Sequence, residues 1–112
     1  LQITPVNDAE GILQDMHWSD GSFGYFPSYL LGSIYDGMYL DSIEAELGSV
    51  DALLAEGRIG EITKWLNEKI HQYGSTRSPK EVISHVCGKE VSAEPLIRYF
   101  KKKYTEVYHL DL

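Results

Sequence analysis

The sequence predicts an all-α fold, a compact bundle of about four to five helices preceded by an N-terminal loop segment. After residue 27, apolar residues recur at spacings of one, three and four, which is the period of an amphipathic helix. Proline, serine and glycine stand where these stripes begin and end. Alternation of apolar and polar residues, which would indicate strands, is absent over any useful length. We therefore expect a single helical domain over residues 1–112, with residues 1–26 mostly loop and residues 27–112 helical.

The longest expected helix begins at Pro27, runs for about twenty residues and ends at Gly48. Gly32 and Gly37 lie inside it at some cost to helix propensity. Glycines kept at such positions usually let another backbone approach closely, so we expect this helix to be deeply buried. Its apolar stripe comprises Leu30, Leu31, Ile34, Tyr35, Met38, Tyr39, Ile43 and Leu47.

Two shorter stretches follow. Residues 50–56 indicate a short helix that ends at Gly57, and residues 59–73 form the next amphipathic stripe, which ends at Gly74.

The last two helices have clear start signals. Ser78-Pro79-Lys80-Glu81 combines a capping box with proline at the first helical position, and this helix ends at Gly88. Ser92 is expected to cap the final helix. The apolar stripe of that helix comprises Leu96, Ile97, Phe100, Tyr104, Val107 and Tyr108.

Charge and cysteine content narrow the function classes. The 17 acidic against 10 basic residues give a net charge of −7, which disfavours binding to a phosphate backbone, so we expect no nucleic-acid partner. No apolar run is long enough to span a membrane.

Cys87 is the single cysteine, so the chain can form no intrachain disulfide, and this residue suits a small buried position. A cytoplasmic location is expected. The chain opens with Leu1 rather than Met, which suggests processing or a piece of a longer protein.

Residues 11–29 carry a dense set of polar and aromatic side chains. The stretch reads GILQDMHW from Gly11 to Trp18 and GSFGYFPSY from Gly21 to Tyr29. An amide, a carboxylate, an imidazole, an indole and two phenols lie here on non-periodic sequence, which is not typical of core packing. We interpret the stretch as a surface that presents side chains to a ligand.

A complete catalytic set is nevertheless missing. No two of the four histidines are separated by four residues, so the chain has no HExxH helix to hold zinc on one face. No P-loop, Rossmann fingerprint or GxSxG elbow occurs either.

The two blocks of residues 11–29 closely resemble a signature of the carboxypeptidase Taq family, the thermostable metal-dependent carboxypeptidases. The pattern GxxQDxHW is met in full, and Gly21 to Tyr29 match its continuation. The resemblance covers essentially the whole chain. Further matching residues are Trp65-Leu66, Lys69-Ile70-His71 with Gly74, Ser78-Pro79 and Leu96 to Phe100.

The resemblance implies that the chain is the C-terminal part of a larger, mainly helical and homodimeric metallopeptidase. Such enzymes remove single residues from peptide C-termini with zinc or another divalent metal. Their metal is held by HExxH and a further glutamate, all upstream of the signature, so this chain is expected to hold no metal and to be inactive alone. The implied partners are a peptide substrate, in the full-length enzyme, and a second copy of the chain.

The resemblance also implies roles for single residues. His17 and Tyr25 have the chemistry of donors to the oxyanion of a tetrahedral intermediate, which makes them the candidate catalytic residues. Gln14 and Asp15 would orient His17 or bind substrate amides, with capping of the loop backbone as the alternative. Trp18 and Tyr29 would line the substrate groove, and for both the alternative is packing.

A second function is compatible with the same residues. The apolar stripes of the helices that start at Pro27 and Ser92 would normally be buried against the rest of an enzyme. Exposed surfaces of that kind favour self-association. The alternative is therefore a non-catalytic helical interaction module derived from this family.

Overall fold

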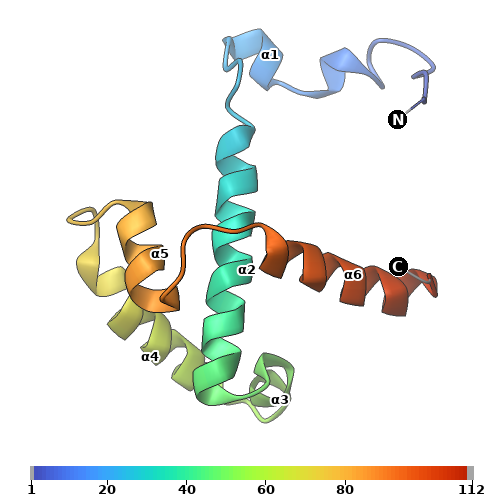
Figure 1. Ribbon diagram of the computed structural model, residues 1–112. Coiled ribbons are helices and arrows are strands. Elements are labelled where there is room, and N and C mark those ends of the chain that lie inside the picture. Colours follow the sequence, from blue (N-terminus) through green and yellow to red (C-terminus); the bar gives the residue numbers. More distant parts are fainter. Residues whose placement is uncertain (1, 111–112) are drawn as a thin grey trace. The chain divides into compact units, whose positions relative to one another are not determined.

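The computed structural model describes residues 2–110 (Figure 1). No residue in this range forms a strand, and the helices account for most of it, which confirms the all-α prediction. The elements in chain order are η1 (Ile12–Gln14), α1 (His17–Asp20), α2 (Pro27–Leu47), α3 (Val50–Ala55), α4 (Ile59–Lys69), η2 (His71–Tyr73), α5 (Pro79–Cys87) and α6 (Glu94–Tyr108).

The chain divides into two units, one up to Leu30 and the other from Leu31 onward. The first holds η1, α1, their loops and the first turn of α2, and none of its described residues is buried. The second holds the rest of α2 and the four helices α3 to α6, in keeping with the expected four to five. Whether both units make one domain stays a prediction.

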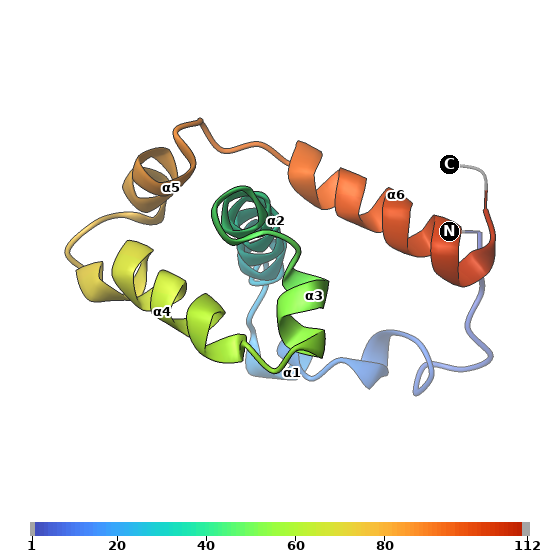
Figure 2. The same cartoon turned by 90° about the horizontal axis from the view of Figure 1, so that it is seen from below.

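The second unit is built around α2. Figure 2 looks along this helix, and α3, α4, α5 and α6 lie around it. Cys87, expected to be buried, is only half-buried, and its thiol donates to the Met38 carbonyl oxygen at 3.7 Å. The buried hydrophobic residues of this unit are Met38, Ile43, Leu53, Trp65, Val82, Ile83 and Leu96.

The expected helix boundaries hold at α2, α3 and α5. Leu47, the last residue of α2, precedes Gly48, whose φ of 87° lies in the left-handed region that glycine adopts without strain. The capping box is confirmed, because the Ser78 hydroxyl accepts from the Glu81 backbone N–H at 3.4 Å and the Glu81 carboxylate accepts from the Ser78 N–H at 2.8 Å.

The capping box makes the stability of the second unit depend on pH. Hydrogen bonds from the hydroxyl and the backbone N–H of Ser78 hold the pKa of Glu81 below its ordinary value of 4.5. A carboxyl with a depressed folded-state pKa stabilises the fold above its unfolded pKa, and that contribution is lost as the pH falls through the folded value. We therefore expect Glu81→Gln to lower the urea midpoint at pH 7 but much less at a pH below the folded-state pKa of Glu81. An equal loss at both pH values would contradict this.

Two sequence-based boundaries were wrong. The stripe over residues 59–73 is not one helix, because Ile70 leaves the helical conformation with φ −125° and ψ −63° and a 3₁₀ turn follows. That turn brings the Tyr73 hydroxyl within 3.2 Å of His85 Nε2 on α5. The N-cap of α6 is Ala93 rather than Ser92, although the Ser92 hydroxyl still accepts from the Glu94 N–H at 3.3 Å.

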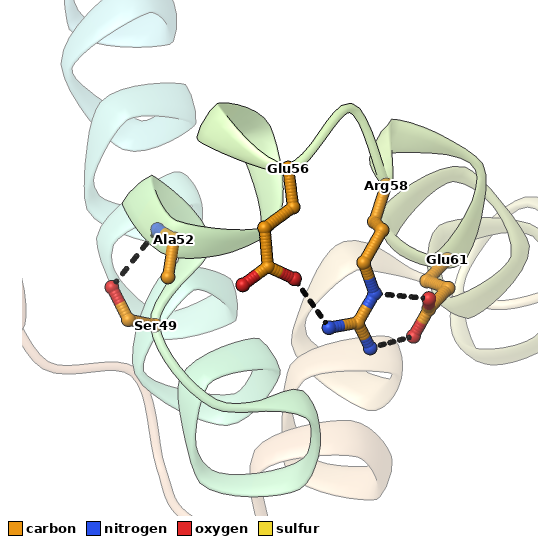
Figure 3. Close-up of polar contacts among 5 residues, drawn as sticks. All are labelled: Ser49, Ala52, Glu56, Arg58 and Glu61. Carbon is orange, nitrogen blue, oxygen red and sulfur yellow. Dashed lines mark hydrogen bonds and ion pairs between the residues drawn. The ribbon is translucent and has the colours of Figure 1, made fainter.

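The junction of α3 and α4 is held by polar contacts (Figure 3). Ser49 caps α3 by accepting from the Ala52 N–H at 3.3 Å. Arg58 binds the Glu61 carboxylate through Nε at 2.7 Å and Nη2 at 2.9 Å, and it reaches Glu56 through Nη1 at 2.8 Å. These contacts raise the pKa of Arg58 and lower that of Glu61, so both stay charged and fix the turn between the two helices.

The two glycines inside α2 differ. A Cβ added to Gly37 would lie 2.9 Å from the backbone N and 3.1 Å from the Cα of Leu96, so α6 packs directly on this position as the sequence led us to expect. The same expectation was wrong for Gly32, where a Cβ would meet no atom of its own unit within 4 Å.

This difference predicts opposite effects of the same substitution. Gly37→Ala should destabilise the second unit by about 1–3 kcal/mol, because the added methyl overlaps the backbone of α6. Gly32→Ala should stabilise α2 by about 1 kcal/mol through helix propensity alone. Urea unfolding followed by circular dichroism measures both, and a stabilising Gly37→Ala would show that α6 does not pack here.

The apolar face of α6 is largely uncovered. The N-terminal end of α6 lies beside α2 and the helix then extends away from it (Figures 1 and 2). Leu96 is its one buried residue in the described part of the chain. Phe100 and Tyr104 stack on each other with ring centroids 5.6 Å apart, and both stay exposed. Within the described residues, burial along this stripe is therefore confined to the start of the helix. None of the described helices has the length and apolarity needed to cross a bilayer.

Candidate active site

The residues singled out from sequence lie in the first unit, from the end of η1 through α1 and the loop after it to the first turn of α2. The Ser22 N–H donates to the His17 carbonyl oxygen at 2.9 Å and closes the loop behind α1. Gly24 follows with φ 76°, a conformation that a side chain would strain. The loop thereby turns back, and Tyr25 comes to lie beside His17.

Asp15 and His17 form the polar centre of the site. One Asp15 carboxylate oxygen, Oδ1, accepts from the His17 backbone N–H at 2.9 Å and lies 2.7 Å from His17 Nδ1. These hydrogen bonds, the backbone one first, hold the pKa of Asp15 below its usual range, so the carboxylate stays charged at neutral pH. Because a carboxylate can only accept, Nδ1 carries the proton, and Nε2 is the nitrogen left to act on a ligand.

Three aromatic rings surround the imidazole of His17. Tyr25 stacks on its face, with centroids 5.6 Å apart and planes 23° apart. Phe26 approaches at 4.9 Å and 61°, and Tyr29 at 6.4 Å and 85°. The histidine ring is therefore contacted by a hydrogen bond at one nitrogen, by one stacked ring and by two rings in edge arrangements.

Tyr25 and Tyr29 also contact each other. Their rings meet edge to face with centroids 5.1 Å apart. The neighbouring Tyr25 side chain raises the pKa of Tyr29 above its ordinary value.

The structure brings four of the six predicted residues together: Asp15, His17, Tyr25 and Tyr29. Gln14 is exposed at the end of η1, and no contact joins its side chain to this group. Trp18 packs on Phe23 with ring centroids 5.4 Å apart. This contact is of the kind described by the packing alternative for Trp18.

Phe26 is the residue that sequence reasoning missed. It lies inside the matched block but was not singled out, because its apolar side chain carries no chemistry of its own. The signal was its position, next to Tyr25 and directly before the proline that starts α2.

The cluster is open to solvent within this chain. The side chains of His17 and Asp15 keep 28% and 32% of their accessible surface, and the rings of Tyr25, Phe26 and Tyr29 are about half exposed. A ligand can reach these groups without any movement of the first unit.

The described residues do not fit a metal. Between residues 2 and 110, no three His, Cys, Asp or Glu side chains come close enough to hold an ion. Asp15 and His17 are the only such pair within this cluster, and the Asp15 oxygen already binds His17.

Comparison with known proteins gives a consistent result. The family described as Carboxypeptidase Taq (M32) metallopeptidase matches residues 1–104. Carboxypeptidase 1 of Bacillus subtilis (strain 168) is 44% identical over 110 residues, 98% of this chain and 22% of the relative. Thermostable carboxypeptidase 1 of Thermus thermophilus is 37% identical over 108 residues, 96% of this chain and 21% of the relative.

A solved structure agrees with these relatives. The crystal structure named BsuCP superposes with a TM-score of 0.84 at 44% identity, covering 95% of this chain and 21% of that one. The chain thus spans about a fifth of the length of the relatives that it matches.

Proposed function

Because this chain belongs to the carboxypeptidase Taq (M32) metallopeptidase family, we propose that it forms the C-terminal portion of a metal-dependent carboxypeptidase that removes single residues from peptide C-termini. Within that enzyme it supplies residues that line the substrate groove and stabilise the transition state. The observation that carries the proposal is the Asp15–His17 hydrogen bond of 2.7 Å beside the Tyr25 ring.

The chemistry of peptide hydrolysis explains why such a pair is useful. Attack on the scissile carbonyl places negative charge on its oxygen, and donors aimed at that oxygen lower the barrier. When both ring nitrogens carry a proton, His17 keeps Nδ1–H on Asp15 and offers Nε2–H to the oxyanion. The Tyr25 hydroxyl, on the neighbouring ring, is the second donor.

The remaining candidates would act on the substrate before the reaction. Gln14 and Trp18 are both exposed and would line the groove. Tyr29, whose ring meets that of Tyr25 edge to face, would also contact the substrate. The metal, zinc or another divalent ion, would be held by the rest of the enzyme, since the described residues do not fit it. No step proposed for this chain passes through the metal.

A chimeric enzyme tests the proposal. In this chimera, the present chain replaces the segment of B. subtilis Carboxypeptidase 1 that it matches. We expect the purified, metal-loaded chimera to release single C-terminal residues from peptides, whereas the 112-residue chain alone releases none. A folded, metal-loaded chimera without activity, or an active isolated chain, would contradict the proposal.

One observation favours self-association as a second candidate function. The exposed stack of Phe100 and Tyr104 on α6 continues an apolar stripe that this chain leaves uncovered. Apolar surfaces of this kind are removed from water when two copies pair. Under this alternative the chain is a non-catalytic module whose role is to form a homo-oligomer.

Sedimentation tests the second candidate. We expect the isolated chain to sediment as a dimer or larger species, and the double substitution Phe100→Lys and Tyr104→Lys to shift it to monomer, because two desolvated charges oppose pairing. Thr105→Lys adds one lysine to the same helix outside the stack and should leave the assembly intact. A monomeric unsubstituted chain at high concentration would exclude this candidate.

A further inference from the structure

We propose that Phe26 is a positioning residue that sets the plane of the His17 imidazole. The proposal rests on the proposed function, because it gives Phe26 a role through a candidate catalytic group. Phe26 itself carries no group that could react or bind a metal. Its contribution is the direction in which His17 Nε2 points.

The contacts of His17 show what Phe26 adds. The bond from Nδ1 to Asp15 fixes one corner of the ring but leaves the ring free to turn about that bond. Tyr25 lies against one face at 23°, and Phe26, the nearest ring at 4.9 Å, meets the imidazole at 61°. With Phe26 in place, the imidazole plane of His17 has only one orientation that keeps its contacts with Asp15, Tyr25 and Phe26. Without it, rotation toward the vacated side costs little.

The backbone holds Phe26 firmly enough to serve in this way. Its carbonyl oxygen accepts from the N–H groups of Tyr29 at 3.0 Å and Leu30 at 3.3 Å, so it caps the first turn of α2. Pro27 follows immediately and restricts the conformation of the residue before it. The Phe26 ring is thus attached to the rigid start of the longest helix.

A purely structural role explains the position of Phe26 poorly. The side chain is 49% exposed, and the first unit has no buried residue among those described, so Phe26 is not part of a core. Its ring contacts His17 and, at 6.2 Å, Tyr29. Both partners belong to the candidate active site, so the ring serves the orientation of that site.

Kinetics of substituted chimeras test the proposal. Phe26→Leu keeps an apolar side chain of similar size but loses the ring, and we expect kcat to fall about tenfold, since small errors in the placement of a catalytic group slow the reaction steeply. KM should stay within about twofold, because the substrate contacts are unchanged. Phe26→Tyr restores the ring and should recover most of kcat.

Phe23→Leu is the matched control. Phe23 lies on the same loop and packs on Trp18 instead of His17, so this variant should keep kcat. A Phe26→Leu enzyme with the kcat of the Phe23→Leu enzyme would overturn the proposal, as would failure of Phe26→Tyr to rescue.

A crystal structure separates this inference from the proposed function. If the unsubstituted chimera is inactive, the proposed function fails, but the orientation of the His17 ring can still be compared between that chimera and its Phe26→Leu variant. In the Phe26→Leu variant, we expect the interplanar angle between the His17 and Tyr25 rings to depart from its value of 23°. An unchanged ring orientation would refute the positioning role.

Discussion

His17→Ala should lower kcat of the chimera by about 10²–10³-fold, the loss typical of removing one donor to an oxyanion. KM should change little, because the lost hydrogen bond forms only as charge develops in the transition state. Steady-state kinetics on a C-terminally blocked and an unblocked peptide measure both constants and confirm that cleavage remains confined to the C-terminus.

His71→Ala is the matched control for this prediction. His71 is exposed in the second unit and its Nδ1 lies 2.8 Å from Asn67 Oδ1, so its removal should leave kcat unchanged. The bound metal should stay at the same stoichiometry in both variants, because neither histidine belongs to a group of possible metal ligands among residues 2–110. Loss of the metal from the His17→Ala enzyme would place His17 in the metal site and refute the donor role.

Asp15→Asn is expected to have the second largest effect, a fall in kcat of about 10–100-fold, as is usual when the partner that orients a histidine is lost. The amide can present either a donor or an acceptor to Nδ1, so the protonation of the imidazole is no longer fixed. Asp15→Glu keeps the carboxylate but places it on a longer side chain, so this variant should recover part of the activity.

Asp20→Asn controls for the general effect of losing a carboxylate on this loop. Asp20 accepts from the Ser22 N–H at 2.9 Å and has no hydrogen bond to His17, so kcat should stay near that of the unsubstituted chimera. Equal losses in the Asp15 and Asp20 variants would mean that both act through the loop alone.

Local signals in the sequence predicted most of the helix boundaries. Pro27, Gly48 and the Ser78–Glu81 capping box were correct because each acts through its own backbone and nearest neighbours. The break at Ile70 was missed because the apolar period continues through it, while the turn depends on where Tyr73 meets α5.

Burial was harder to predict than helix position. Gly32 and Gly37 look alike in the sequence, and only the path of α6 distinguishes them. The apolar stripe on α6 was expected to be buried against the rest of an enzyme. Most of it is exposed here, and an apolar stripe by itself does not specify what covers it.

The candidate site shows the same limit. Asp15 and His17 could be linked from sequence because they are two residues apart, and their hydrogen bond is local. The approach of Tyr25 and Phe26 to His17 depends on the loop that turns back at Gly24, a path that spacing alone does not give.

The central claim is that His17 faces the reacting carbonyl of a peptide substrate. A crystal structure of the metal-loaded chimera with a phosphinic peptide, whose phosphinate oxygens mimic the tetrahedral intermediate, tests it most directly. The account predicts His17 Nε2 at about 2.7–3.1 Å from a phosphinate oxygen, with Nδ1 still bound to Asp15. A His17 ring that points away from the phosphinate, with Nε2 bonded to another group of the protein, would contradict it.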